Sequence, residues 1–534
     1  MRLLPVLLLA LILWTAHPVR AQFTVLQDPD VWHLLSQAPQ DPAERLALAD
    51  RALSRLDPEA PGNTHIRMDL LEARAEALEA LGRTAEAAAV YEEKATLAEA
   101  QGLSLNHDPV DLMARSQDLH AKSGDIDSAV RAFLAGERLL SGDDPADSRR
   151  HIVELLFATD RARSGAAGPR NVYGHARGPL EQGIARVSIP PTHRRGRLEH
   201  PSLWRMEFHR EPGRHVVLED VSPLPSPDFF DMLADRLSNA PQDEVLVLIH
   251  GFNVDFDSAM RRSAQITHDL RYEGVPIVYS WPSRGSTLGY VADTAAVRHS
   301  GRNLSRFLDA LVDQAGATSI HLVAHSMGNR ALTDALELMA LRRDADAEQD
   351  PVFEEVLFAA PDVDAGLFGA MAETFRPLAR RMTLYGSSED LALDVSRRIH
   401  GDAPRAGEGG PLMTPFQGID SIDMSAAGRD MLAHQYYAED SAARLDMLML
   451  IWRNTSPERR CGLSPEPREG GTVWRLSSGP CSDRTLFDII ASLRRAGIER
   501  RKDAETYLDS LATELDLSRE IRDIVSTLLT DSES

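Results

Sequence analysis

The segment LVAHSMGNRA (residues 322–331) places one serine between small residues at the end of an apolar run. It nearly matches the G-x-S-x-G turn, in which a serine is exposed between a strand and a helix. Ala324 stands at the first glycine position and Gly328 at the second. One added methyl group is a small change to such a turn, so we interpret Ser326 as the nucleophile of an acyl-transfer reaction.

An attacking serine also needs N–H donors for the oxyanion that forms during the reaction. Met327 follows the serine and would give one backbone donor. An upstream apolar run ends in HGFN (residues 250–253), where Phe252 would give the second. The alternative is that Gly251 only marks a tight exit from a strand. We expect His250 to order this loop and His325 to be a packing residue.

The acid that orients the catalytic histidine should follow the serine in the chain. Asp390 ends the segment RMTLYGSSED, two apolar runs beyond the serine, and is the expected acid. Asp362 and Asp364, in the segment APDVD after the intervening run, are the alternative acids. Aspartates without this role would cap helices or stabilise turns.

Only two histidines follow the expected acid, His400 and His434. His400 ends a helical segment, where capping explains it. His434 lies in a loop between a short apolar run and the final helix of the domain, from which it could reach back to the serine. We therefore expect the triad Ser326, Asp390 and His434.

The elements that must position these residues are visible as apolar runs separated by amphipathic helical stretches. The runs are EVLVLIH (244–250), PIVYSW (276–281), SIHLVAH (319–325), EEVLFAA (354–360) and MTLYGS (382–387). Such a pattern predicts a mostly parallel sheet with helices on both faces. Shorter β-prone runs between residues 151 and 241 should open the same domain. The predicted class over residues 151–453 is α/β, with a site at the carboxyl ends of the strands.

Residues 22–150 predict a separate all-α domain. Two segments share a glycine at an inter-helix turn, Gly82 and Gly124, then an alanine five residues later and an aromatic residue nine residues later. Small residues let paired helices approach closely, and the aromatic residue fills the gap between hairpins. The pattern resembles tetratricopeptide repeats, with a longer spacing of 42 residues.

Residues 1–21 have the charged start, apolar run and small-residue cleavage site of a signal peptide. We therefore expect export to the periplasm or the medium, or anchoring if the segment is not cleaved. Residues 454–534 predict a C-terminal extension with helices at 483–496 and 504–529. It contains both cysteines, Cys461 and Cys481, which could form a disulfide in an oxidising compartment or remain free thiols.

Composition limits the partners. The 534 residues are 43% hydrophobic and 26% charged, with a formal net charge of −23. Such an acidic balance disfavours nucleic acid and anionic lipid surfaces, and no further segment is apolar enough to span a membrane. The cysteines lack further ligands at metal-binding spacing, so we expect no metal there, and the chemistry implies no cofactor. A small-molecule ester is the expected substrate, and the helical repeats could bind a protein partner.

Six motifs occur in one order, and together they carry a family resemblance: HGFN, YSWPSRG, AHSMGN, APDVD, YGSSED and DMLAHQYY. As a set they resemble a bacterial α/β-hydrolase family of unknown function, generically described as esterase- or lipase-like. The resemblance covers about residues 156–452 and implies that Ser326 is the nucleophile and His434 the histidine. It implies that Asp390, or one of the APDVD aspartates, is the acid.

Two functions from different classes are consistent with these observations. The first is a serine hydrolase that cleaves a carboxylic ester through an acyl-enzyme; amides and thioesters would use the same groups. The alternative is an exported interaction or scaffold protein, in which the helical repeats bind a partner and the hydrolase domain is inactive.

Overall fold

The computed structural model describes residues 39, 41–56, 63–101, 109–141, 150–191, 193–196, 198, 212–284, 290–343, 350–426, 440–477, 479–498, 501–512 and 518–529. The expected signal peptide and His434 therefore lie outside the described residues. The chain divides into two compact units, one of residues 1–149, 492–517 and 531–534, and one of residues 150–491 and 518–530. Among the described residues, no helix is long and apolar enough to cross a membrane.

The first unit is helical, as the sequence predicts. Its N-terminal helices are α4 (Pro42–Arg55), α5 (Asn63–Ala80), α6 (Thr84–Gln101), α7 (Pro109–Ser123) and α8 (Ile126–Ser141). Gly82 and Gly124 occupy the α5–α6 and α7–α8 turns with φ of +70° and +80°, a conformation that glycine adopts without steric cost. Ala87 and Ala129 are fully buried, which allows the paired helices to approach closely. Helix α18 (Arg501–Ala512) belongs to the same unit and packs against α8.

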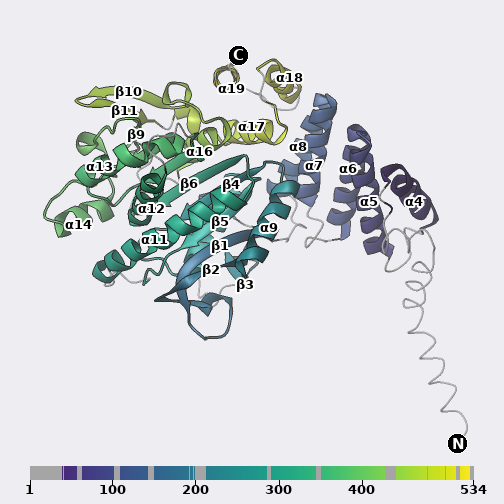
Figure 1. The fold of residues 1–534 in the computed structure, drawn as a ribbon. Coiled ribbons are helices and arrows are strands. Elements are labelled where there is room, and N and C mark those ends of the chain that lie inside the picture. Colours follow the sequence, from purple (N-terminus) through teal and green to yellow (C-terminus); the bar gives the residue numbers. More distant parts are fainter. Residues whose placement is uncertain are drawn as a thin grey trace, which may run out of the picture. The chain divides into compact units, whose positions relative to one another are not determined.

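The second unit is built on one large, mostly parallel sheet (Figure 1). Its strands are β1 (His151–Arg163), β2 (Tyr173–Ile189), β3 (Val217–Leu224), β4 (Glu244–Ile249), β5 (Val275–Ser280), β6 (Ser319–His325), β7 (Phe353–Ala359), β8 (Ala379–Gly386), β9 (Asp420–Asp423), β10 (Leu463–Arg468) and β11 (Gly471–Leu476). Their order is β10-β11-β9-β8-β7-β6-β4-β5-β1-β2-β3. The five strands predicted from apolar runs are confirmed as β4 to β8, because burial on both faces favours apolar side chains at nearly every position of a strand.

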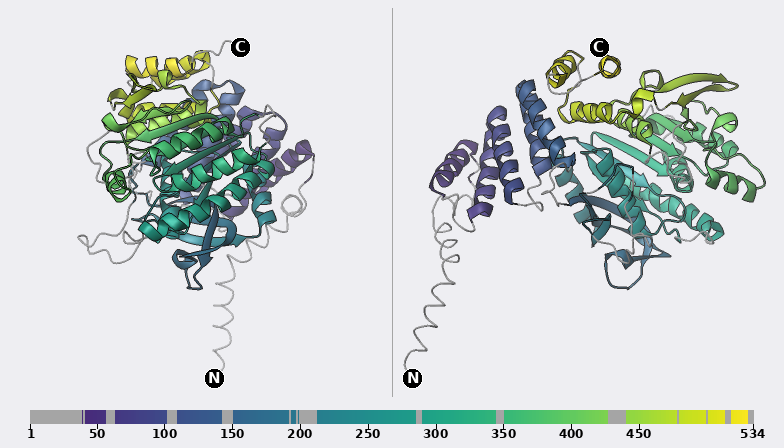
Figure 2. Two further views of the ribbon diagram at one scale, coloured as in Figure 1. Left: turned by 60° about the vertical axis from the view of Figure 1, so that its left-hand side comes forward. Right: turned by 180° about the vertical axis from the view of Figure 1, so that it is seen from behind.

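Helices cover both faces of this sheet (Figure 1; Figure 2). They are α9 (Ser226–Asn239), α10 (Phe256–Asp269), α11 (Tyr290–Gln314), α12 (Gly328–Arg342), α13 (Ala365–Phe375), α14 (Leu391–Ile399) and α16 (Ser441–Arg453). Alternate residues of β5 separate the faces: Ile277 packs in the core with α9, α11, α12 and α13, whereas Val278 packs in the core with α10. The predicted α/β-hydrolase architecture is therefore observed.

The C-terminal extension adds to the sheet. Hairpin β10–β11 pairs with β9, and a disulfide between Cys461 and Cys481 closes the segment that contains it. Helix α17 (Arg484–Arg495) follows. The single helix expected over 504–529 is wrong: α18 ends at Ala512 and α19 (Arg519–Leu528) begins separately. Ser518 caps α19, because its hydroxyl accepts the N–H of Ile521, and a new N-cap starts a new helix.

Candidate active site

Ser326 occupies a strained turn between β6 and α12. Its φ is +52°, a left-handed conformation that costs a non-glycine residue about 1–2 kcal/mol. Hydrogen bonds stabilise the turn: the Ser326 N–H donates to the carbonyl of Ala359 (2.9 Å), and its carbonyl accepts the N–H groups of Asp362 (3.2 Å) and Asn329 (3.1 Å). Strain of this kind persists where surrounding contacts enforce it, and it projects a nucleophile from the end of a strand.

The two glycines near Ser326 are required by close contacts. A Cβ at Gly328 would lie 2.3 Å from the carbonyl oxygen of His250, and a Cβ at Gly251 would lie 2.9 Å from the Cβ of Ser326. The turn around Ser326 (residues 325–328, the nucleophile turn) therefore touches residues 250–254, which we name the oxyanion loop. Ala324 instead lies on β6 with its methyl group fully buried in the main core. An alanine at that position is compatible with this turn.

The side chain of Asn329 stabilises the nucleophile turn through three hydrogen bonds. It is fully buried, and its side-chain amide donates to the carbonyls of Ala324 (3.2 Å), Ser326 (3.1 Å) and Ala359 (3.1 Å). The amide thus joins β6, the turn and the end of β7. Sequence reasoning did not single out this residue; a buried amide directly after the second glycine of the motif was the available signal.

Phe252 and Met327, the expected oxyanion donors, lie on the two segments that meet at Ser326. Met327 is fully buried at the start of α12, and Phe252 is in the loop that Gly251 brings against Ser326. Within the described part of the chain, no hydrogen bond uses the backbone N–H of either residue. The positive end of the α12 dipole also points toward the turn, which favours negative charge there.

Arg161, at the end of β1, supports the oxyanion loop. Its guanidinium is fully buried and donates to the carbonyls of Val254 (2.8 Å) and Ser283 (3.0 Å) and to the hydroxyl of Ser280 (2.9 Å). Burial lowers its pKa to about 10, so it remains a cation at neutral pH. The sequence does not reveal this role of Arg161, because its acceptors are backbone carbonyls far away in the chain.

His250 makes contacts that order the oxyanion loop. Burial, and secondarily the Arg161 cation, lower its pKa to about 3, so the ring is neutral. Its carbonyl accepts the indole N–H of Trp281 (2.7 Å), and its Nε2 lies 3.2 Å from the Ser280 hydroxyl. These contacts connect the end of β4 to the end of β5.

The three candidate acids differ in their surroundings. Asp390 is 5% exposed and begins α14 just after β8; its Oδ1 accepts the N–H groups of Ala392 (3.0 Å) and Leu393 (3.1 Å). Asp364 caps α13 by accepting the N–H of Leu367 (2.9 Å). Asp362 is held by four side chains that bond to both of its oxygens.

Those four side chains stabilise Asp362 in its ionised form. Its Oδ1 accepts from Arg405 (3.0 Å) and Ser396 (2.5 Å), and its Oδ2 accepts from Arg330 (3.0 Å) and the Tyr290 hydroxyl (2.9 Å). Burial alone would raise the pKa of Asp362, but Arg330 and Arg405 outweigh it and keep the pKa below its usual value. This carboxylate is the centre of a structural ion network.

Tyr290 connects this network to the oxyanion loop. Its ring packs edge-on against Phe252 with centroids 5.3 Å apart, while its hydroxyl bonds to Asp362. The N–H of Asp362 in turn bonds to the Ser326 carbonyl. Tyr290 and Asp362 thus connect the loop after β4 and the segment after β7 to the turn that carries Ser326.

The expected base, His434, lies in the segment 427–439 outside the described residues, between β9 and α16. The competing His400 is the C-cap of α14, where its Nδ1 lies 2.8 Å from the Ser396 carbonyl. Capping is therefore the role that its contacts support.

A cavity of about 500 Å³ lies beside the nucleophile turn. Its lining includes Leu248 and Val323 of the sheet and Ala259, Arg262 and Ile266 of α10. Gly251 and His325, which lie next to Ser326, also line it. The described part of this lining is mixed, with apolar strand residues and polar groups from α10 and the oxyanion loop.

Comparison with known proteins supports the hydrolase fold. Residues 228–451 match the family model described as "Alpha/beta hydrolase of unknown function (DUF900)". The matched range runs from α9 into α16 and contains every candidate site residue named from the sequence. No curated protein and no solved structure matches the chain.

Proposed function

We propose that the chain is a serine hydrolase that cleaves carboxylic esters through an acyl-enzyme; the match of residues 228–451 to a family of alpha/beta hydrolases of unknown function supports the hydrolase part of this proposal. One observation carries this proposal: Ser326 sits at φ +52° between β6 and α12, in contact with a loop that presents a backbone donor. A purely structural serine has no need of a strained turn that three hydrogen bonds and two glycines maintain.

In the proposed first step, Ser326 Oγ attacks the ester carbonyl carbon while the His434 imidazole takes its proton. The N–H groups of Phe252 and Met327 stabilise the negative charge on the carbonyl oxygen. Each such donor contributes about 10²–10³-fold to the rate in enzymes of this kind. The C–O bond to the alcohol then breaks, and His434 gives its proton to the leaving oxygen.

In the second step, water attacks the acyl-enzyme, and His434 takes a proton from it. The tetrahedral intermediate collapses, the proton passes to Ser326 Oγ, and the carboxylic acid leaves. Asp390 would orient the imidazole and stabilise its charged form. No cofactor enters either step.

Asp390 is proposed as the acid for two reasons. It follows β8, two strands after the nucleophile in the chain, and backbone donors at the start of α14 fix its carboxylate. Asp362, by contrast, is held by two arginines and two hydroxyl groups, which leaves little capacity to accept from an imidazole.

We also propose that the chain is exported and that its helical unit binds a protein partner. The signal-like residues 1–21 support export, and the disulfide between Cys461 and Cys481 suits an oxidising compartment. Stacked helix pairs commonly form binding surfaces, which supports the second proposal.

A panel of p-nitrophenyl esters from acetate to palmitate tests the proposed activity. The purified chain should hydrolyse at least one member, and Ser326→Ala should lose the activity while keeping the same circular dichroism spectrum. Hydrolysis by Ser326→Ala at the wild-type rate would contradict the proposal. Failure of the folded wild-type chain on every ester and on matched amides and thioesters would favour the scaffold alternative.

A further inference from the structure

A second group of titratable side chains lies at the end of the sheet opposite to Ser326. His193 follows β2, whose last residue pairs with the first residue of β1. His268 and Asp269 end α10, which runs back from the carboxyl end of β4 to the start of β5. These three residues therefore meet at the amino ends of the parallel strands, away from the proposed reaction.

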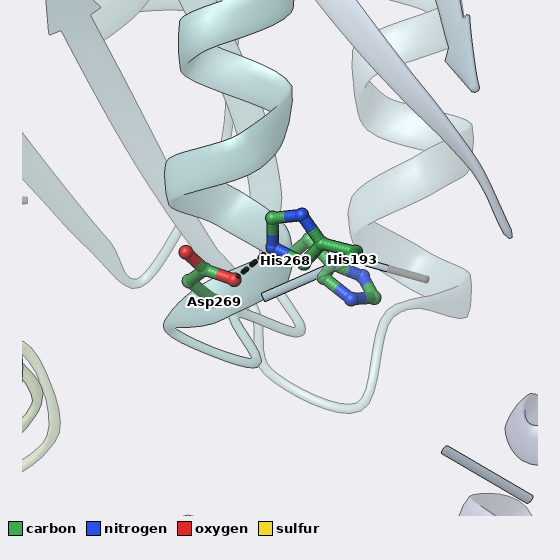
Figure 3. Close-up of side chains that lie close together, drawn as sticks. All are labelled: His193, His268 and Asp269. Carbon is green, nitrogen blue, oxygen red and sulfur yellow. Dashed lines mark hydrogen bonds and ion pairs between the residues drawn. The ribbon is translucent and has the colours of Figure 1, made fainter. Parts of the chain in front are cut away.

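The three side chains are close enough to share one ion (Figure 3). One ligand atom from each lies within 4.8 Å of the other two, and this is the only such group among the described residues. The Nε2 of His193 is 2.8 Å from Oδ1 of Asp269, and the rings of His193 and His268 have centroids 5.4 Å apart. The side chain of His193 is 6% exposed and that of Asp269 is fully buried.

Surrounding groups already orient the carboxylate of Asp269. Its Oδ2 accepts the backbone N–H of Gly196 (2.6 Å) and the side-chain amide of Gln265. Outer contacts of this kind fix the carboxylate ligands of metal sites. The ring nitrogens of His268 make no hydrogen bond with any other described residue.

The types of ligand atom and the nearby charges indicate which ion this cluster would bind. Arg195 and Arg271 are nearby cations, and both form ion pairs with Asp488 at 2.5 and 3.1 Å. With one carboxylate in the cluster, Ca²⁺ and Mg²⁺ lack the oxygen ligands that they require. Imidazole nitrogens with one carboxylate oxygen suit Zn²⁺. The C-terminal end of α10 adds a partial negative charge that favours a cation.

We propose that His193, His268 and Asp269 bind one Zn²⁺ ion, with water as the fourth ligand. Tetrahedral ligands at about 2.0–2.1 Å from zinc are roughly 3.3 Å apart, so the His193–Asp269 pair must open by about 0.5 Å. The ion takes the place of the hydrogen bond between those two side chains: the neutral His193 ring gives up its Nε2 proton to solvent and takes up one at Nδ1, which leaves a lone pair on Nε2 for zinc. The site would tie the segment after β2 to the end of α10 and thereby stabilise the unit, with no part in ester cleavage.

Zinc content and thermal unfolding of the full chain test this site. The chain is treated with a chelator, exchanged into buffer, titrated with ZnCl₂ and passed through gel filtration before elemental analysis. We expect one Zn²⁺ per chain and a higher midpoint of unfolding with Zn²⁺, but no such rise with Ca²⁺ or Mg²⁺. Co²⁺ should give the visible absorption of a tetrahedral site.

His268→Ala is the decisive variant, because loss of this ring removes no hydrogen bond between described residues. It should remain folded, lose the Co²⁺ spectrum and bind Zn²⁺ at least about tenfold more weakly. His175→Ala, at an exposed position of β2, is the matched control and should behave as wild type. Zinc binding that is absent in wild type, unchanged in His268→Ala, or equally weakened in both variants would overturn the proposal.

Discussion

Gly328→Ala should damage catalysis through the oxyanion loop, although the substituted residue touches no substrate. The new Cβ would lie 2.3 Å from the carbonyl oxygen of His250 and 3.1 Å from that of Ile249. An ordinary C···O contact is about 3.3 Å or longer, so the two segments must separate by about 1 Å. The His250 carbonyl is itself held by Trp281, so the displacement passes into the loop that carries Phe252.

A misplacement of about 1 Å in a catalytic constellation costs about 10²-fold in rate. We therefore expect kcat/KM of Gly328→Ala to fall by about 10²-fold on the best p-nitrophenyl ester. Overpacking should also lower the free energy of unfolding by about 1–3 kcal/mol. The assay combines ester kinetics with thermal unfolding by circular dichroism, at a temperature where both proteins are folded.

Ala324→Gly is the matched control, because it restores the first glycine of the motif. Its methyl group lies in the main core, and removing it forces no two segments apart, so kcat/KM should stay close to the wild-type value. Stability should fall by about 1 kcal/mol, since glycine weakens a strand interior. The reasoning is refuted if folded Gly328→Ala keeps full activity, or if Ala324→Gly loses as much activity as Gly328→Ala.

Asp390→Asn preserves a capping side chain but should lower kcat by about 10³–10⁴-fold. Asp362→Asn should mainly lower the unfolding midpoint, because it leaves two arginines uncompensated. Ester kinetics and melting curves with the opposite result for the two variants would identify Asp362 as the acid. Arg161→Met should lower both kcat and the unfolding midpoint, since the carbonyls of Val254 and Ser283 lose their donor. A wild-type kcat in this variant would show that the oxyanion loop does not depend on Arg161. Burial raises the pKa of Glu355 from 4.5 to about 8. Between these pH values the unfolded chain loses a proton that the folded chain keeps, so the contribution of Glu355 to stability falls as pH rises, by up to about 1.4 kcal/mol per pH unit. Glu355→Gln should therefore stabilise the protein more at pH 8 than at pH 5, and an equal gain in urea unfolding at both values would contradict this.

The bounds of strands β4 to β8 could be predicted within a few residues, because strands buried on both faces have nearly continuous apolar runs. The same holds for the strand-to-helix turn at Ser326, because small residues two positions before and after the serine have a local geometric cause. Both features depend on neighbours in the chain. They are therefore visible in short segments of sequence.

The supports of the site were not predictable in this way. Arg161 and Asn329 donate to backbone carbonyls, and a carbonyl leaves no trace in the residue type that carries it. The four donors of Asp362 come from separate helices and loops, so only the folded chain shows that this carboxylate is already occupied. The predicted helix over 504–529 failed for a related reason, since helical periodicity continued across the residue that caps α19.

The central claim is that Ser326 is an activated nucleophile, and covalent labelling tests it most directly. The folded full-length chain is incubated with a fluorophosphonate probe, digested, and analysed by mass spectrometry for the modified peptide. Our account predicts one phosphonylated residue, Ser326, with labelling abolished in Ser326→Ala and in heat-unfolded protein. Absence of labelling in the folded chain, or labelling that persists in Ser326→Ala, would contradict it.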